Sequence, residues 1–243
     1  MPEGPALYKT CDYNAPLSSD AIDWIITALR QSESANIVDL GCGWGQLLGD
    51  LVVAFPTITA TGFDTDPDLI TQAQSIVCSR GIERRATFRV ADCTTVTCTA
   101  DVVICMGSTH AWESLDSALA AFHTLLQQNG KVIVGVPFWE NPPSDAACAA
   151  LGMSPADLPT YESLLSSITV AGFEVQGFRA STLAEWDAFE TAWCASRIVW
   201  LRDNPTHPDH TRFSDQLIKH RTMWLDGYRK QLGFTVIIAS KHA

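Results

Sequence analysis

The sequence predicts an α/β protein built on a mainly parallel sheet, and two observations carry this prediction. Between residues 36 and 136, short apolar runs alternate with longer amphipathic stretches. The apolar runs show little apolar–polar alternation, which is typical of strands buried on both faces of a sheet covered by helices. A glycine-rich turn follows the first run, and ligands of such sheets bind beyond the carboxyl ends of the strands.

The chain has 243 residues and a formal net charge of −11. An acidic surface repels phosphate backbones, so nucleic acid is not an expected partner. No basic amphipathic stretch indicates a membrane surface, and no apolar run approaches the ~18 residues that span a bilayer. The first residues lack the pattern of a signal peptide, and the eight Cys show no metal-ligand spacing. We therefore expect a cytoplasmic protein with no membrane partner and no bound metal.

The pattern predicts the elements in order along the chain. In the first half we expect strands at 37–40, 59–64, 86–91, 101–106 and 131–136, and helices at 46–55, 67–80 and 113–128. In the second half we expect a helix at 161–171, a strand at 173–178, a mostly helical stretch at 182–232 broken at 204–208, and a strand at 234–239. Asp66 is the expected N-cap of the second helix, with Pro67 at its first position.

The turn after the first strand reads Asp39-Leu40-Gly41-Cys42-Gly43-Trp44-Gly45. Its three glycines allow a sharp turn and a close approach of the backbone to a ligand. The dinucleotide fingerprint Gly-x-Gly-x-x-Gly requires a third glycine where this chain has Gln46, so the turn matches the dinucleotide-binding fingerprint only in part. The alternative is a glycine-rich turn that binds nothing.

Two further carboxylates follow strand ends. Asp64 closes the second strand, where a carboxylate can accept hydrogen bonds from both hydroxyls of a ribose. Asp92 follows the third strand and can accept the exocyclic amine of an adenine. For each, the alternative is an ordinary solvated turn residue.

The segment 38–45 resembles motif I of the class I S-adenosylmethionine-dependent methyltransferases. Residues 62–64, 91–93 and 126–136 resemble the ribose-binding, adenine-binding and fifth-strand elements of that family. The resemblance implies a Rossmann-like, doubly wound, seven-stranded, mostly parallel sheet with an antiparallel last strand. The helical pattern at 182–232 in turn predicts a helical insertion between strands six and seven.

A narrower resemblance extends over most of the chain. Residues 14–18, 107–110, 137–139, 185–187 and 232–234 are similar to a group of bacterial small-molecule methyltransferases of poorly defined substrate. In that group the N-terminal segment is expected to fold over the cofactor. We predict a single domain over 1–243, composed of an N-terminal cap segment (1–35), a cofactor-binding core (36–181), a helical insertion (182–232) and a final strand (233–243).

The resemblance implies a binding site for S-adenosyl-L-methionine. A cleft that holds several carboxylates suits the cationic sulfonium, and the absence of a pyrophosphate removes the need for glycine at Gln46. The expected cofactor-binding residues are Asn14, Asp39, Gly41, Cys42, Gly43, Gly45, Asp64, Thr65, Asp92, Cys93, Met106 and Gly107.

The segment that leaves the fourth strand is the place where substrate meets the methyl group in this fold. His110 is the best candidate for a general base, because an unperturbed imidazole titrates near ~6.5. Glu113 could orient His110 or serve instead. The alternatives are a loop histidine that only packs or hydrogen-bonds, and a carboxylate placed at a helix start by the dipole.

Aromatic side chains are candidates for an apolar acceptor pocket or for cation–π contact with a sulfonium. The predicted substrate-binding residues are Tyr8, Tyr13, Trp112, Trp139, Glu140 and Trp186. Trp186, Trp193 and Trp200 recur at intervals of seven and share one helical face. This face is expected to pack against the sheet domain, and the alternative is that part of it lines the acceptor pocket.

The predicted activity is transfer of a methyl group to a small, partly apolar molecule by in-line displacement. The acceptor atom (oxygen, nitrogen, sulfur or carbon) and the oligomeric state, monomer or homodimer, stay open. Two rival hypotheses remain: an NAD-dependent oxidoreductase and a non-catalytic sensor that binds the cofactor.

Overall fold

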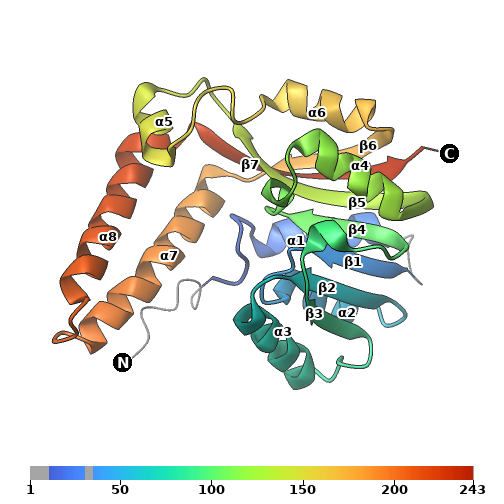
Figure 1. Cartoon of the computed structure of the whole chain (residues 1–243), viewed down its shortest axis with the longest axis horizontal. Helices are drawn as coiled ribbons and strands as arrows, with labels where there is room; N and C mark the ends of the chain where they lie inside the picture. The colour runs from blue at the N-terminus through green and yellow to red at the C-terminus, as the bar shows by residue number, and fades with distance from the viewer. Residues whose placement is uncertain (1–10, 31–34, 243) are drawn as a thin grey trace. The chain divides into compact units, whose positions relative to one another are not determined.

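A computed structural model describes residues 11–30 and 35–242 (Figure 1). The chain divides into two compact units. The sheet unit comprises residues 18–136, 162–180 and 234–243, and the helical unit comprises residues 1–17, 137–161 and 181–233. The single-domain organisation of the chain stays a prediction.

The sheet unit is built on seven strands in the order β3-β2-β1-β4-β5-β7-β6. Strands β1 to β5 pair in parallel, whereas β7 runs antiparallel to β6. The predicted seven-stranded sheet with an antiparallel last strand is confirmed, as is the helical insertion between strands six and seven. The strands are β1 (Asn36–Leu40), β2 (Thr59–Asp64), β3 (Ala86–Val90), β4 (Ala100–Met106), β5 (Leu126–Trp139), β6 (Phe173–Ala180) and β7 (Leu232–Lys241).

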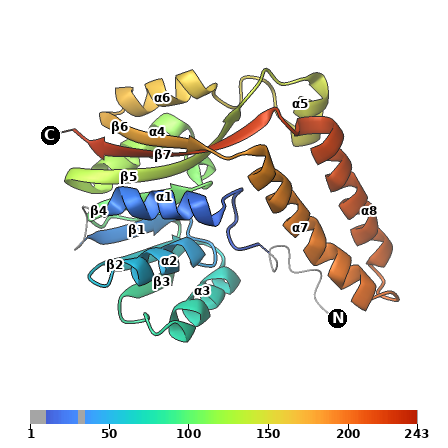
Figure 2. The same cartoon turned by 180° about the vertical axis from the view of Figure 1, so that it is seen from behind.

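Helices cover both faces of this sheet. Helices α1 and α2 lie on one face, and α4 lies on the other (Figures 1 and 2), where side chains of α4 and α6 line a shared pocket. This two-sided cover explains why the central strands β1 and β4 are buried along nearly their whole length. The helices are α1 (Ser19–Leu29), α2 (Gln46–Ala54), α3 (Pro67–Ser79), α4 (Leu115–Leu125) and α6 (Tyr161–Val170).

The start of α3 is formed as the sequence predicts. The side chain of Asp66 accepts hydrogen bonds from the backbone N–H groups of Asp68 and Leu69, and Pro67 occupies the first turn. These bonds satisfy N–H groups that have no partner within the helix. Because Asp66 caps the helix, the neighbouring carboxylate at the end of β2 is available for other contacts.

The helix predicted at 113–128 is shorter in the structure. It begins at Leu115 because Ser114 is its N-cap and accepts a hydrogen bond from the backbone N–H of Ser117. It ends at Leu125 because Leu126 already pairs with Ala100 of β4. The predicted last residues of this helix, 126–128, therefore lie within β5, where the register shifts between the pairs Ala100–Leu126 and Val102–Lys131.

The helical unit contains α5 (Asp145–Leu151), α7 (Leu183–Asp203), α8 (His210–Thr222) and the π-helix η3 (Met223–Tyr228). Helix α7 begins with a capping box in which Thr182 and Glu185 bond each other's backbone N–H. The predicted helical stretch and its break are confirmed, because α7 and α8 are separated by a turn at 204–209. Helix α5 was not predicted.

No helix within residues 11–30 and 35–242 combines the length and the apolar character needed to cross a membrane.

Candidate functional site

The glycine turn is anchored to the end of the neighbouring strand. The backbone N–H groups of Gly41 and Cys42 both donate to the carbonyl of Phe63 in β2, at 2.8 and 2.9 Å. Gly41, Gly43 and Gly45 have φ values of 78°, 54° and 71°, in the left-handed region that L-residues rarely adopt. The turn therefore needs glycine for its conformation and is held in place by β2.

The three glycines differ in what surrounds them. A Cβ atom at Gly41 would overlap the side chain of Ser108, and one at Gly45 would overlap the ring of Phe88. A Cβ atom at Gly43 would meet nothing within 4 Å. Gly41 and Gly45 are thus required by packing, whereas Gly43 borders open space in which a ligand can approach the backbone.

The carboxylate of Asp64 is tied to this turn. Its Oδ2 accepts a hydrogen bond from the backbone N–H of Gly43 at 2.9 Å, and its Oδ1 accepts one from Asp66 at 3.0 Å. A carboxylate has about four acceptor positions, so two remain for hydroxyl donors of a ligand. The exposed Thr65 follows directly. The structure brings Asp64 beside Gly43, and its ribose-binding role stays a prediction.

Asp39 is the most unusual group of the site. It is 2% exposed, and its Oδ1 has no hydrogen-bond partner among the described residues. Burial, and secondarily the charge of Asp64, raises the pKa of Asp39 to about 7. An unpartnered buried carboxylate is costly, and a nearby cation would offset that cost. A cationic ligand therefore fits this part of the sheet unit.

Asp92 is an exposed residue that lies two positions after the end of β3. Its Oδ1 accepts hydrogen bonds from the backbone N–H and the hydroxyl of Thr94, at 2.9 and 2.8 Å, and these hold its pKa below the ordinary value. Burial raises the pKa of the adjacent Cys93 to about 11, so this thiol is protonated at neutral pH. Asp92 caps the short 3-10 helix Cys93–Thr95, and its adenine contact stays a prediction.

The loop after β4 carries the candidate base. Gly107 has a φ of 76°, and its N–H donates to the carbonyl of Gly135 in β5 at 2.8 Å. The Nδ1 of the exposed His110 lies 3.2 Å from the carbonyl oxygen of Gly107. A carbonyl can only accept, so Nδ1 donates and Nε2 is left to take a proton. Met106 precedes this loop and is half-buried.

Two neighbours of His110 in the sequence, Trp112 and Glu113, differ from it in their contacts. Glu113 is exposed and lies just before Ser114, the N-cap of α4, so it is not part of the helix. The ring of Trp112 packs edge-on against Phe122, with centroids 5.1 Å apart. The substrate-binding role of Trp112 stays a prediction.

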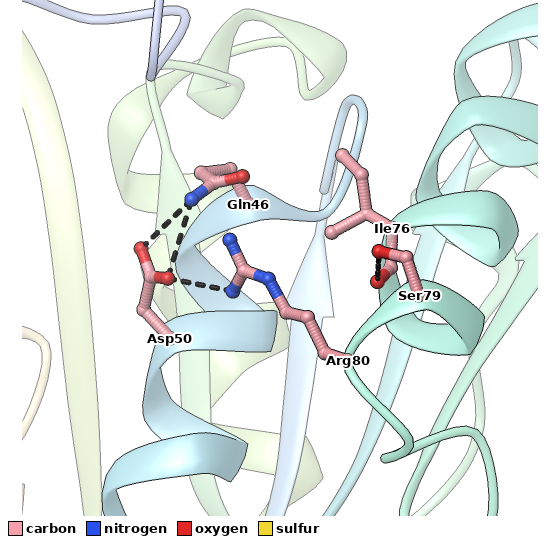
Figure 3. Close-up of polar contacts among 5 residues, drawn as sticks. All are labelled: Gln46, Asp50, Ile76, Ser79 and Arg80. Carbon is pink, nitrogen blue, oxygen red and sulfur yellow. Dashed lines mark hydrogen bonds and ion pairs between the residues drawn. The ribbon is translucent and has the colours of Figure 1, made fainter.

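Gln46, in the place of the third dinucleotide glycine, is directed along its own helix (Figure 3). Its Nε2 donates to the carboxylate of Asp50 at 3.2 and 3.3 Å, and Nη1 of Arg80 donates to Asp50 at 2.7 Å. Nearby in α3, the hydroxyl of Ser79 donates to the carbonyl of Ile76. The Gln46 side chain thus belongs to a polar network that links α2 to α3.

Several predicted residues belong to the helical unit. Trp139 is 5% exposed, and its Nε1 donates to the carbonyl of Pro155 at 3.1 Å. Glu140 and Asn14 are exposed, and Tyr13 is half-buried. Tyr8 lies outside the described residues. The acceptor and cofactor roles of these side chains stay predictions.

The tryptophan face of α7 makes its ring contacts within the helical unit. Trp186 stacks on Trp224, with centroids 5.6 Å apart, and Trp193 stacks on His220 at 3.6 Å. Trp200 packs edge-on against Phe213 and His207, both at 4.9 Å. The expectation of a packing face is confirmed by these contacts with α8 and the segments beside it. Packing of the face against the sheet domain and a role of Trp186 in the acceptor pocket stay predictions.

Two features of the structure escaped the sequence interpretation. Ser108 lies against Gly41, and its hydroxyl donates to the Gly41 carbonyl at 3.4 Å. Glu190 is 5% exposed and is bound by Tyr228 and His220. These residues are far apart in the chain, so no local motif reveals the contacts.

The fold is a Rossmann-like α/β fold of the kind that methyltransferases use. It is defined by the order of the strands, the glycine turn and the carboxylates at the strand ends. Residues 38–132 match the family model described as a methyltransferase domain. The match confirms the resemblance inferred from the motifs. A search of curated proteins gives no match.

Solved structures match over nearly the whole chain. YjhP of E. coli shares 22% identity with a TM-score of 0.88, covering 98% of both chains. A SAM-dependent methyltransferase from Geobacter sulfurreducens in complex with S-adenosyl-L-homocysteine shares 22% identity with a TM-score of 0.87, covering 96% of this chain and 95% of that one. One from Thiobacillus denitrificans, also in complex with S-adenosyl-L-homocysteine, shares 23% identity with a TM-score of 0.87, covering 97% and 98%. At these identities the likeness establishes the fold.

Proposed function

We propose that this chain is an S-adenosylmethionine-dependent methyltransferase whose sheet unit holds the cofactor. The observation that carries the proposal is the buried, unpartnered Oδ1 of Asp39 beside the glycine turn. A cationic ligand offsets the cost of this carboxylate, whereas a dinucleotide pyrophosphate would increase it. The methyltransferase-domain match over 38–132 and the S-adenosyl-L-homocysteine bound by two structural relatives support the same cofactor.

Each predicted contact has a chemical reason. The open space at Gly43 admits the ligand to the backbone of the turn, and Asp64 has acceptor positions left for ribose hydroxyls. Asp92 uses only Oδ1 for its two bonds to Thr94, so Oδ2 is available for an adenine amine. When bound, the cofactor supplies an electrophilic methyl group on a sulfonium. The proposed role of the chain is to hold that group and an acceptor in line.

His110 is the proposed base for acceptors that lose a proton. Its exposed ring donates through Nδ1 to Gly107, which fixes Nε2 as the accepting nitrogen of the neutral form. Glu113 is the runner-up, because it is exposed on the same loop. An acceptor that is already deprotonated would need neither group.

The finer parts of the proposal concern the acceptor and the setting. We propose a small, partly apolar acceptor and a cytoplasmic, bacterial-type enzyme, because the chain resembles bacterial small-molecule methyltransferases and carries a net charge of −11. The atom that receives the methyl group and the choice between monomer and homodimer are left to experiment.

Calorimetric titration with S-adenosyl-L-homocysteine, S-adenosyl-L-methionine and NADH tests the cofactor. We expect micromolar binding of the first two, and binding of NADH alone would overturn the proposal. A screen of small acceptors with methyl-labelled cofactor then tests turnover. Cofactor binding without any S-adenosyl-L-homocysteine production across the screen would favour the rival sensor hypothesis.

A further inference from the structure

A cavity of about 460 Å³ lies between α7 and α8, and all of its lining residues belong to the helical unit. Its size falls within the range of about 300–1,000 Å³ that holds small organic molecules. The α7 residues that line it recur with helical spacing, so they form one stripe that faces α8 and η3. The stripe contains Asp187, Glu190, Thr191, Cys194, Ala195 and Ile198.

The two carboxylates that line the cavity are both matched by protein donors. Glu190 accepts hydrogen bonds from the Tyr228 hydroxyl at 2.9 Å and from Nε2 of His220 at 2.5 Å. Asp187 holds Arg229 through two hydrogen bonds of 2.9 and 2.7 Å. All four carboxylate oxygens of these acids therefore already accept hydrogen bonds from the protein.

Arg221 also lines the cavity, and it differs from Arg229 in that it has no carboxylate partner among the described residues. Among residues 11–30 and 35–242, no carboxylate forms an ion pair with its exposed guanidinium. Its neighbour is the thiol of Cys194: burial raises the pKa of Cys194, and Arg221 opposes that effect. Arg221 is thus the guanidinium of the lining that a ligand carboxylate can pair with.

Apolar surface adjoins this charge. Ile198 and Leu225 line the cavity and are 46% and 56% exposed, although both are large aliphatic residues. Exposed apolar surface gathered in a concave site is typical of a surface that a ligand covers. The site therefore combines one cationic group with an aliphatic wall.

We propose that this cavity binds a small organic acid, with the carboxylate paired to Arg221 and the apolar body covering Ile198 and Leu225. The inference concerns a second site and does not depend on the methyltransferase proposal. A ligand of this chemistry can be the methyl acceptor itself or an acid that binds without reacting.

Calorimetry on the full chain without cofactor tests the site, with octanoate as the probe and octanamide as its neutral match. We expect octanoate to bind about tenfold more tightly, because the guanidinium–carboxylate hydrogen bond is charge-assisted. Arg221→Met should lower the octanoate affinity to that of octanamide. The control Arg202→Met, an exposed arginine of α7 paired with Asp203, should leave it unchanged.

A second pair of variants tests the contribution of the aliphatic wall to binding. Leu225→Ala should weaken both probes by about fivefold, whereas Ile218→Ala, at a 60% exposed residue of α8 outside the cavity, should weaken neither. All four side chains are exposed, so thermal melting should be unchanged and should separate lost binding from lost folding.

Three results would overturn the site: no binding of octanoate up to about 10 mM, equal affinity for acid and amide, or equal effects of Arg221→Met and Arg202→Met. Adding methyl-labelled cofactor identifies the source of the ligand. Label transfer to octanoate that Arg221→Met abolishes assigns the cavity to the acceptor, and binding without transfer assigns it to a non-reacting acid. Because the binding assay contains no cofactor, failure of the methyltransferase proposal leaves its result unaffected.

Discussion

Buried carboxylates behave differently in the two units. In the sheet unit, Asp39 is 2% exposed and leaves one oxygen without a partner among the described residues. In the helical unit, Glu190 is 5% exposed, yet both of its oxygens are bound by the side chains of Tyr228 and His220. Burying a carboxylate is costly unless hydrogen bonds compensate. The comparison teaches that Asp39, which leaves one oxygen without a partner, suits a bound cation, whereas Glu190, whose oxygens both have partners, needs none.

The largest expected effect is on cofactor affinity in the sheet unit. Asp64→Ala removes the acceptor predicted to hold two ribose hydroxyls and also releases the N–H of Gly43. We expect about 1,000-fold weaker binding of S-adenosyl-L-homocysteine, since each of the two hydrogen bonds to the charged group contributes about 1.5–3 kcal/mol. Calorimetry measures this effect.

Asp68→Ala is the matched control, because Asp68 is an exposed acid in the first turn of α3, four residues further along. Its cofactor affinity should stay within about twofold of the wild type. Equal loss of affinity in both variants would assign the effect to the general acidity of this region and would remove Asp64 from the site.

Asp39→Asn tests the unpartnered acid through pH. The pKa of Asp39 is about 7 in the folded chain against 3.8 for an ordinary Asp, so the folded state binds more protons between these values. The wild-type free energy of unfolding should therefore fall as pH rises from about 4 to about 7 and level off above. The amide introduced by this substitution has no charge to bury, and the variant should be more stable by about 4 kcal/mol at pH 8.

Binding should change in the opposite direction. Wild-type affinity for S-adenosyl-L-methionine should rise with pH through about 7 as Asp39 ionises, and Asp39→Asn should lose both this rise and much of the affinity. Denaturant melts and titrations at pH 5, 6, 7 and 8 measure the two effects. A variant that is less stable than the wild type at pH 8 would contradict the charge argument.

Local signals accounted for much of the sheet unit. Asp66 and Pro67 correctly predicted where α3 begins. The glycines between Gly41 and Gly45 correctly predicted a turn with left-handed backbone conformations. The number of strands and the antiparallel last strand came from the family resemblance, and the order of the strands was not predicted, because spacing along a chain does not say which strands pair. The early start of β5 at Leu126 escaped prediction because a long-range pairing with β4 overrides the helical pattern there.

The helical unit was harder to predict beyond its helices. The partners of Glu190 lie 30 and 38 residues away, at His220 and Tyr228, on α8 and η3. Only the pairing of α7 with α8 brings these side chains together, and nothing in the local sequence specifies it. The same reason explains why the tryptophan face indicated packing but did not identify its partners on α8 and η3.

Glu190→Ala should destabilise the chain without affecting the cofactor. Removing the carboxylate leaves the hydroxyl of the buried Tyr228 without its acceptor and opens a small cavity, which should cost about 2 kcal/mol. Chemical denaturation measures the loss, and titration should give an unchanged affinity for S-adenosyl-L-homocysteine. Asp215→Ala, at an exposed acid of α8, should be neutral. Equal stability of both variants would show that the buried acid does not stabilise the helix pair.

The smallest effect is expected at the link between α2 and α3 in Figure 3. Arg80 and Asp50 form a 2.7 Å ion pair with side chains 27% and 22% exposed, so solvent screens only part of it. Arg80→Ala should cost about 1 kcal/mol of stability, and a double-mutant cycle with Asp50→Ala should give a coupling of similar size. The paired carboxylate here resembles Glu190 and differs from Asp39, so cofactor affinity should stay constant. An affinity loss in Arg80→Ala would mean that the α2–α3 link also positions the glycine turn. Asp50 would then support the ligand site even though its carboxylate is paired.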